Sequence, residues 1–397
     1  MITIEMNMYH ATAIAALVLM LGRLLVKKVP LFSRYCIPAP VVGGLVYSLV
    51  HLVLYMTGIA TINFDGTLQS FFMTVFFTSV GFMASFALLK KGGVQVFIFL
   101  GVSIVLVTCQ DIIGSLLAGI LGLDARLGLA MGSIPLVGGH GTAGSFGPMM
   151  EGLGIDGAAV VSLAAATYGL VAGSMMGGPV ATARLKKHNL KSSVTSVAQN
   201  NDAAEAAAAP EISNEKFLNA ALYFALAIGA GELISKVFVA IGMTMPSYIG
   251  AMLAAAAIRN IVDAAKVEAP MAEIDALGNL SLNLFLAMAL MGLKLWQLID
   301  LALPMIIILL VQTVFMAFYA YFVVFNIMGR DYEAAVMSAA TCGFGMGATP
   351  NAMANMGAIA NKYGPAPRAF FVVPLVGSLF IDFFNSVIIS AFLSFLG

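Results

Sequence analysis

The chain has 397 residues, of which 61% are apolar and only 10% are charged. Soluble globular domains carry about 45–50% apolar and about 25% charged residues, so this composition excludes that class and indicates an integral membrane protein. The 19 basic and 19 acidic residues give a net charge of zero, and this balance does not indicate nucleic acid as a partner.

Ten apolar runs are long enough to cross a lipid bilayer as helices. A hydrocarbon core of about 30 Å requires roughly 20 helical residues. In chain order, the runs lie near residues 9–26, 36–56, 69–89, 94–121, 157–183, 217–241, 245–265, 278–299, 301–328 and 368–395. Two further apolar runs, near 127–150 and 334–357, contain several glycines as well as proline and are therefore poor continuous helices.

The lysines and arginines favour an interpretation in which these two glycine-rich runs turn back within the membrane. Cytoplasmic loops carry the excess of positive charge. With ten crossings, two re-entrant hairpins and both termini outside, sixteen basic residues face the cytoplasm, and only Arg126, Lys236 and Lys294 lie outside. If both hairpins are counted as crossings, ten basic residues lie on one side of the membrane and nine on the other, which is no bias. We therefore predict a multi-pass membrane protein with its N- and C-termini outside.

A polar segment, residues 185–216, divides the chain into two membrane halves. It contains DAAEAAAAPE and little apolar periodicity, which predicts a flexible cytoplasmic linker. The first half, residues 1–184, includes the hairpin near 127–150, and the second half, residues 217–397, includes the hairpin near 334–357. Each half has five crossings. Because five is odd, the second half enters the membrane from the opposite side, which is the inverted-repeat plan of many secondary transporters.

Internal similarity supports a duplication. The segment LGLDARLGLAMGSIPLVGGHGTAG (121–144) aligns with MGRDYEAAVMSAATCGFGMGATPN (328–351), with glycine, aspartate and threonine at matching positions. The predicted fold is an all-α integral membrane protein with about ten transmembrane helices. These form two inverted-topology repeats of five, each with one re-entrant glycine-rich hairpin.

The hairpin tips, GGHGTAG (138–144) and GFGMGATPN (343–351), are the predicted binding site. Bare backbone at membrane depth is tolerated only where it is buried in protein or lines a water-filled cavity. Glycines let N–H groups approach a ligand closely, and helix N-termini carry a partial positive charge that suits a carboxylate. The alternative interpretation of such glycines is close helix packing. Side chains near the tips that can bind a carboxylate are Ser133, His140, Thr142, Thr349 and Asn351, although His140 can equally satisfy a buried polar contact.

Three ionisable residues, Asp111, Glu232 and Asp382, lie within predicted crossings, where such a residue is a functional candidate. Asp111 and Glu232 can instead lie near a helix end in contact with water. Asp382 lies in mid-span, and the i, i+3 spacing directs Asn385 to the same side. Together they suit a cation, either sodium or the ammonium group of a substrate, and Asn283 is a third candidate for this role.

Four segments resemble the sodium/glutamate symporters of bacteria. They are GGHGT (138–142), NLSLNLFLAMALMGLKLW (279–296), CGFGMGATPNAMANM (342–356) and FIDFFN (380–385), and the resemblance extends over almost the whole chain apart from the linker. It implies uptake of L-glutamate driven by inward sodium flow, with sodium as the coupling ion and no other cofactor. It also implies a bacterial inner-membrane location, a homodimer, opposed re-entrant loops and no enzymatic activity.

The loop motifs of this family carry over to both tips. In the first half they correspond to Gly138, Gly139, His140, Gly141 and Thr142. In the second half they correspond to Gly343, Gly345, Gly347, Ala348, Thr349 and Pro350. One position departs from the family pattern, because Ala143 follows the threonine where glycine is common, and this puts the local backbone geometry in question.

Several alternatives remain at this stage. No arginine lies within a crossing away from its ends, which leaves another small carboxylate or amino acid open as the substrate, with proton coupling through Asp382 or His140. A passive channel is less favoured, because the two loops differ in sequence and lack a repeated carbonyl filter. An intramembrane enzyme lacks a nucleophile motif, a metal cluster or paired carboxylates. The favoured mechanism is alternating access, in which a part carrying both hairpins moves against a fixed scaffold, as in an elevator.

Overall fold

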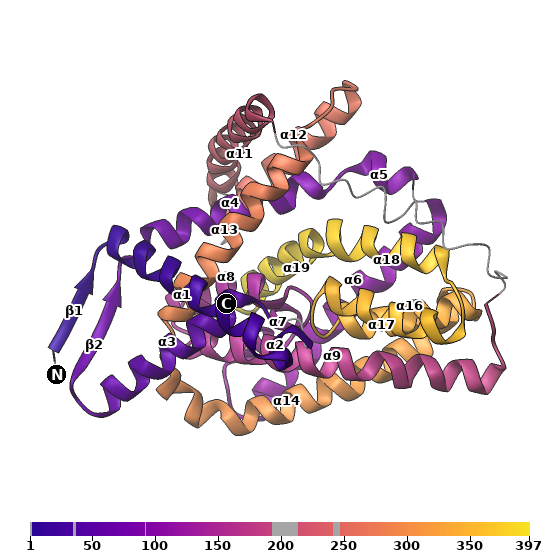
Figure 1. Ribbon diagram of the computed structural model, residues 1–397, viewed down its shortest axis with the longest axis horizontal. Coiled ribbons are helices and arrows are strands. Elements are labelled where there is room, and N and C mark those ends of the chain that lie inside the picture. The colour runs from indigo at the N-terminus through magenta and orange to yellow at the C-terminus, as the bar shows by residue number, and fades with distance from the viewer. Residues whose placement is uncertain (1, 35–36, 92, 193–212, 241–246) are drawn as a thin grey trace.

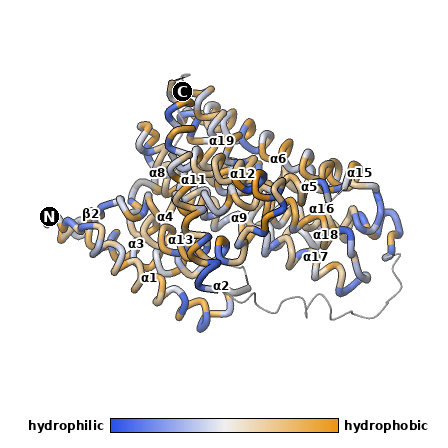
Figure 2. The backbone as a smooth tube through the Cα atoms, turned by 90° about the horizontal axis from the view of Figure 1, so that it is seen from above, coloured by the Kyte–Doolittle hydropathy of each residue, from blue (hydrophilic) through white to orange (hydrophobic). Residues whose placement is uncertain are grey.

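The computed structural model describes residues 2–34, 37–91, 93–192, 213–240 and 247–397 (Figure 1). Among these residues, eight helices are long and apolar enough to cross a membrane, and a bent pair forms a ninth span if it is counted as one. Hydrophilic residues gather at helix ends and in the connecting loops (Figure 2). The chain is therefore a multi-pass, predominantly helical membrane protein, as its composition predicts.

The candidate spans coincide with nine of the ten predicted crossings. The bent pair, Pro367–Gly377 and Ile381–Leu396, is broken by an angle of 41°. The single spans are Met8–Lys28, Ala39–Met56, Thr67–Lys90, Gly93–Ile120, Ala158–His188, Asn214–Phe238, Met271–Met291 and Leu301–Ile327. The tenth prediction, near 245–265, coincides with a helix of 18 residues that is not among these spans.

The first half contains two strands, and its long helices follow the predicted order. Its elements are β1 (Ile2–Met6), α1 (Met8–Lys28), α2 (Pro30–Arg34), α3 (Ala39–Met56), β2 (Ala60–Phe64), α4 (Thr67–Met83), α5 (Phe86–Lys91), α6 (Gly93–Ile120), the 3-10 helix η1 (Ala125–Met131), α7 (Ser133–Leu136), α8 (Gly139–Gly152) and α9 (Ala158–His188). The predicted hairpin near 127–150 thus corresponds to η1, α7 and α8.

The second half consists of helices alone in its described residues. Its elements are α11 (Asn214–Ala240), α12 (Ser247–Ala264), α13 (Met271–Met291), the 3-10 helix η2 (Leu295–Gln297), α14 (Leu298–Phe318), the π-helical turn η3 (Tyr319–Val324), α15 (Phe325–Ile327), α16 (Tyr332–Phe344), α17 (Thr349–Tyr363), α18 (Pro367–Leu379) and α19 (Ile381–Leu396). The predicted hairpin near 334–357 corresponds to α16 and α17. Most of the predicted linker lies outside the described residues.

The two-stranded ribbon is a feature that the sequence analysis did not predict. β1 and β2 pair in parallel from Ile2 opposite Ala60 to Met6 opposite Phe64. Both strands are only five residues long, so they give a weak signal beside the long apolar runs. Parallel strands require a crossover connection, and here α1 and α3 provide it. The ribbon projects at one end of the molecule (Figure 1).

The helices pack as two groups. The six-helix group consists of α1, α3, α4, α11, α12 and α13, and among the described residues its contacts surround three smaller apolar clusters. The hairpin group consists of α6 to α9 with η1, and α14 to α19 with η3, and it shares the largest apolar cluster. Between the groups, the main packing contacts are those of α13 with α8, with smaller ones of α19 with α4 and α12.

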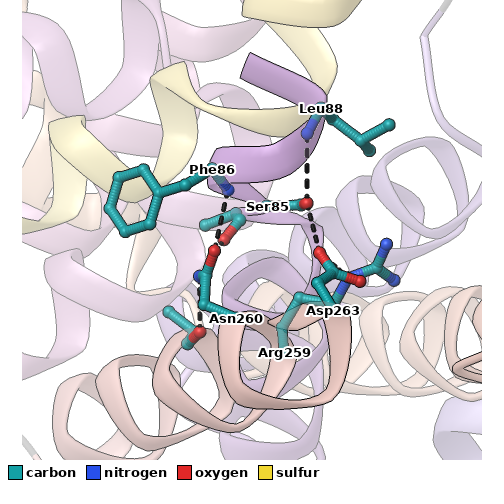
Figure 3. Close-up of polar contacts among 8 residues, drawn as sticks. Ser85, Phe86, Leu88, Arg259, Asn260 and Asp263 are labelled. Atoms are coloured by element: carbon teal, nitrogen blue, oxygen red, sulfur yellow. Dashed lines mark hydrogen bonds and ion pairs between the residues drawn. The ribbon is translucent and has the colours of Figure 1, made fainter. Parts of the chain in front are cut away.

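A short connector between α4 and α5 leads from the six-helix group to the hairpin group, and α12 holds it (Figure 3). The side-chain amide of Asn260 donates to the Ala84 carbonyl at 2.8 Å and accepts from the Phe86 N–H at 2.8 Å. The Ser85 hydroxyl donates to the Asp263 carboxylate, which also pairs with Arg259 at 3.1 Å. The connector is therefore fixed to the six-helix group.

Helices α16 and α17 form an antiparallel pair. Asn355 of α17 donates to the Ala339 carbonyl of α16 at 3.1 Å, and Gly343 lies directly against Ala352. A four-residue turn, Gly345 to Ala348, joins the two helices.

A small-residue face of α9 packs on α16. A Cβ atom at Gly169 would lie 2.0 Å from the Met346 carbonyl oxygen in the turn after α16, and Gly173 and Gly177 face α16 itself. These glycines thus permit close helix packing.

Candidate functional site

A cavity of about 310 Å³, here called the central cavity, lies between the six-helix group and the hairpin group. This volume is within the range of about 300–1,000 Å³ that is typical of small-molecule sites. Its walls come from α3, α4 and α13 on one side, and from both glycine-rich tips, α9, α18 and α19 on the other. Segments from both halves of the sequence therefore meet at one place.

Pro350 of the second motif lines this cavity, as do nine of the fourteen residues proposed as substrate or cation ligands. These nine are Gly138, Gly139, His140, Gly141, Asn283, Gly347, Ala348, Thr349 and Asp382. Residues 138–141 come from the first tip and residues 347–349 from the second, so the cavity lies between the tips. The remaining five are close by in the structure but do not belong to its walls.

The first tip ends in the N-terminus of α8. Gly138 is the N-cap, and its carbonyl accepts the N–H of Thr142, which leaves the N–H groups of Gly139, His140 and Gly141 without partners in the helix. Gly139 has a φ of +59°, a conformation that glycine adopts at little cost. A Cβ atom at Gly139 would also lie 3.2 Å from the Gly347 carbonyl oxygen. Glycine is thus required here for two reasons, and the two tips lie almost in contact.

The second tip ends in the N-terminus of α17. Its N-cap, Ala348, has extended backbone, and Pro350 lies in the first turn, where its missing N–H costs no hydrogen bond. The Thr349 hydroxyl donates to the Gly377 carbonyl at 2.8 Å, which fixes α17 against α18. Two helix N-termini therefore face the same cavity, and both favour negative charge on a ligand.

Three polar side chains complete the walls. His140 is buried, and its Nε2 atom lies 3.0 Å from the Thr167 hydroxyl. Asp382 lies in the first turn of α19, and Asn283 lies on α13 in the opposite wall. The lining residues of the described structure include no arginine or lysine. A negatively charged ligand would therefore depend on backbone N–H groups.

The other five proposed residues hold the tips in place. Ser133 donates to Asp111 from its N–H at 2.8 Å and from its hydroxyl at 2.9 Å, and Asn385 donates to the Ser133 carbonyl at 3.2 Å. Asn351 donates to the Leu170 carbonyl of α9 at 2.8 Å.

Thr142 and Gly345 belong to the tips but not to the cavity walls. Thr142 packs against Gly138, and the carbonyl of Gly345 accepts a hydrogen bond from Gln110 at 2.7 Å. Their contacts are with protein rather than with the cavity.

Two further ionisable residues differ sharply in environment. Asp111 is fully buried, so the interpretation that places it at a wetted helix end is wrong. Glu232 is exposed and lies 3.6 Å from Lys236, one helical turn away.

Sequence reasoning missed the wall that the six-helix group provides. It consists of Pro38, Pro40, Phe76, Leu282, Leu286 and Asn283, of which only the last was proposed. Apolar residues in helices that are apolar on every side give no periodic signal, so their orientation cannot be inferred from the pattern. In the sequence, only the two prolines at the start of α3 distinguish this wall from other apolar segments.

Comparison with known proteins assigns the chain to a family. The profile of the family described as sodium/glutamate symporter matches residues 4–365. The sodium/glutamate symporters of Escherichia coli (strain K12) and Shigella flexneri are each 40% identical over 397 residues, covering 97% of this chain and 98% of the relative. That of Haemophilus influenzae (strain ATCC 51907 / DSM 11121 / KW20 / Rd) is 36% identical over 387 residues, covering 96% of each. These relatives are named as symporters and not as enzymes, and the chain belongs to the sodium/glutamate symporter family.

Proposed function

We propose that this protein takes up L-glutamate by coupling it to the inward flow of sodium. The observation that carries the proposal is the central cavity, in which the N-termini of α8 and α17 and the carboxylate of Asp382 face one small volume. Glutamate has two carboxylates and one ammonium group. The two helix N-termini match the two carboxylates, and the carboxylate of Asp382 matches the ammonium group.

In this arrangement each carboxylate of glutamate binds at one helix N-terminus. The N–H groups of Gly139, His140 and Gly141 bind one, and the N–H of Thr349 at the start of α17 binds the other. Asp382 pairs with the ammonium group, because no ion pair among the described residues involves its carboxylate. Asn283 contributes an amide to the same site or to the coupling ion, and Asn385 acts only through Ser133.

We further propose that the segments near 127–150 and 334–357 are re-entrant. Asp331 and Arg368, which flank the second segment, form an ion pair at 2.7 Å. A full crossing between them would separate them by a hydrocarbon core of about 30 Å. The contact supports a segment that returns to its side of entry.

A parity argument supports the same topology for the first segment. Ser85 lies near the end of the third predicted crossing, and it contacts Asp263, which lies near the end of the seventh. Four crossings separate them if the first segment is re-entrant, and five if it is a full crossing. Only an even number returns the chain to the same side of the membrane. Tyr55 stacks on Trp296, with ring centroids 3.9 Å apart, and six predicted crossings separate them if the first segment is re-entrant, which is again an even number.

Helix packing supports the inverted repeats. Counting the long helices from the start of each half, and so leaving out the five-residue α2, α3 corresponds to α12 and α4 corresponds to α13. α3 packs on α13, and α12 packs on α4, so the equivalent helices exchange partners. The pair α1 and α3 likewise corresponds to the pair α11 and α12. This is the pattern that two repeats related by a two-fold axis produce.

Transport then follows from motion of the hairpin group against the six-helix group. The central cavity lies at their boundary, and the hairpin group carries both tips and Asp382. Sliding of the hairpin group would expose the tips to each side in turn, as alternating access requires. The six-helix group is the scaffold in this proposal, and the homodimer implied by the family resemblance forms through it. Light scattering of the detergent-solubilised protein tests the dimer.

Uptake into proteoliposomes tests the transport activity. We expect labelled L-glutamate to accumulate above equilibrium under an inward sodium gradient and to stay at equilibrium under an equal potassium gradient. Protein-free liposomes are the control. Absence of uptake under both gradients contradicts the substrate, and other small carboxylates with proton gradients are then the next candidates. Flux that neither saturates nor depends on sodium indicates a channel instead.

Replacing Gly139 by alanine is expected to weaken glutamate uptake about 5- to 30-fold. The left-handed conformation costs a residue with a Cβ about 1–2 kcal/mol, and that atom also crowds the Gly347 carbonyl at 3.2 Å. The apparent affinity for glutamate in the proteoliposome assay measures the effect. Gly119→Ala is the matched control, because nothing lies within 4 Å of the added atom there. Wild-type affinity in Gly139→Ala would show that the tip geometry does not determine binding.

A further inference from the structure

A second cavity, of about 760 Å³ and here called the end cavity, lies at one end of the six-helix group. Its walls come from the first turns of α11, the last turns of α12, the loop after α12 and the first turn of α13. It shares no lining residue with the central cavity. Because α11 begins a candidate span at Asn214, its first turns lie where that span enters the membrane. The end cavity is therefore at the membrane surface.

The charged residues that line the end cavity have both signs. Lys216 and Arg259 are basic, and Asp263, Glu268 and Glu273 are acidic. Arg259 pairs with Asp263 at 3.1 Å, and its Nη1 atom has no hydrogen-bond partner. Among the described residues, no ion pair includes the other three. A ligand with only negative charge would face unpaired carboxylates, so a ligand with charges of both signs fits these walls best.

One side of the end cavity is apolar and faces lipid. Leu222 and Leu226 of α11 line it one helical turn apart, and they are 54% and 64% exposed. Only 22% of the most apolar part of α11 is buried inside the protein, so this helix presents most of its surface to the bilayer. Tyr223 lies between these leucines in the chain, and tyrosine is typical of the membrane–water interface. A ligand with a polar head and apolar chains matches both sides of the cavity.

We propose that the end cavity binds a phospholipid whose headgroup is zwitterionic, as in phosphatidylethanolamine. The phosphate binds Lys216 and Arg259, and the primary ammonium group pairs with Glu268, while Glu273 adds negative charge on the same wall. The acyl chains lie along the two exposed leucines of α11. This lipid site goes beyond the proposed transport of glutamate and does not depend on it.

The end cavity also adjoins the connector between α4 and α5. Arg259 and Asp263 line the cavity, and the Asp263 carboxylate accepts the hydroxyl of Ser85 in the connector (Figure 3). A phosphate beside Arg259 holds the guanidinium in place against Asp263. Bound lipid is therefore expected to stabilise the folded state, since the unfolded chain does not form this surface.

Thermal unfolding of the delipidated protein in detergent tests the site. Phosphatidylethanolamine is titrated in mixed micelles, and phosphatidylcholine and phosphatidylglycerol are titrated in parallel. Phosphatidylcholine has a fully methylated nitrogen without an N–H donor, and phosphatidylglycerol has no ammonium group. We expect phosphatidylethanolamine to raise the Tm in a saturable way, with its half-maximal effect at a concentration about two- to tenfold lower than for the other two lipids.

Variants of the lining residues locate the effect. Lys216→Gln and Glu268→Gln are each expected to raise the concentration for half-maximal stabilisation about two- to fivefold, because each removes one exposed ion pair with the lipid. Asn219→Trp keeps every charge and fills the cavity from an exposed position, so we expect it to abolish the preference for phosphatidylethanolamine. Lys236→Gln and Glu215→Gln, on α11 but outside the cavity walls, are the matched controls.

Three outcomes contradict the lipid site. Equal stabilisation of the wild-type protein by all three lipids overturns the headgroup assignment. A wild-type preference in Asn219→Trp, or in the double variant of Lys216→Gln and Glu268→Gln, overturns the location. Soluble phosphoethanolamine or inorganic phosphate that reproduces the full effect at the same concentration shows that the ligand is a free phosphate compound and not a lipid. Failure of the transport proposal appears elsewhere, as a lack of sodium-driven glutamate uptake by wild-type proteoliposomes.

Discussion

Replacing Gly169 by leucine is expected to prevent the protein from folding. A Cβ atom at Gly169 would lie 2.0 Å from the Met346 carbonyl oxygen, so even the first added carbon overlaps the backbone of the turn that follows α16. Overpacking of a core typically costs about 1–3 kcal/mol when side chains can adjust, and a buried backbone carbonyl cannot move aside as a side chain does. The contact also holds the second tip, because Met346 lies in the turn between α16 and α17.

Size-exclusion chromatography of a fluorescent fusion in detergent measures this effect. The Gly169→Leu variant is expected to lose the monodisperse peak of the wild-type protein. Gly178→Leu, in the same helix, is the matched control, because nothing lies within 4 Å of a Cβ atom there. A wild-type elution profile for Gly169→Leu would show that α9 and α16 are not packed as closely as described.

Replacing Asp382 by asparagine is expected to lower the affinity for glutamate about 30- to 3,000-fold. Removing one partner of a buried charge pair costs about 2–5 kcal/mol, and every 1.4 kcal/mol corresponds to a tenfold change. Asparagine keeps the shape of the side chain and removes its charge, so the ammonium group of the substrate loses its counter-ion. Asp156→Asn removes an exposed carboxylate and serves as the control.

Competition by glutarate distinguishes the two roles considered for Asp382. Glutarate has both carboxylates of glutamate but no amino group. If Asp382 binds the ammonium group, Asp382→Asn loses the preference for glutamate over glutarate and keeps the wild-type sodium dependence of uptake. If it binds sodium, the preference remains and the sodium concentration needed for half-maximal uptake rises. A variant with wild-type values for both would exclude Asp382 from the site.

The sequence determined the class of protein and the location of most helices, because each of these depends on local composition. The free energy of placing a segment in lipid is largely a sum over its own residues, so an apolar run predicts a span without knowledge of its neighbours. The two glycine-rich runs were recognisable for the same reason. Backbone that cannot form a continuous helix must find its partners within the protein, and both runs contribute to the central cavity.

Only the tertiary structure decided which polar residues face the cavity and which hold the tips. Asp382 and Asn385 are three residues apart and were predicted to act together, yet Asp382 lines the cavity while Asn385 bonds to Ser133. Asn351, proposed as a ligand, instead ties α17 to α9. The ribbon and the wall formed by Phe76 and Leu282 likewise depend on segments distant in sequence. Helices that are apolar on all sides carry no periodic signal for orientation, so only packing between segments determines these contacts.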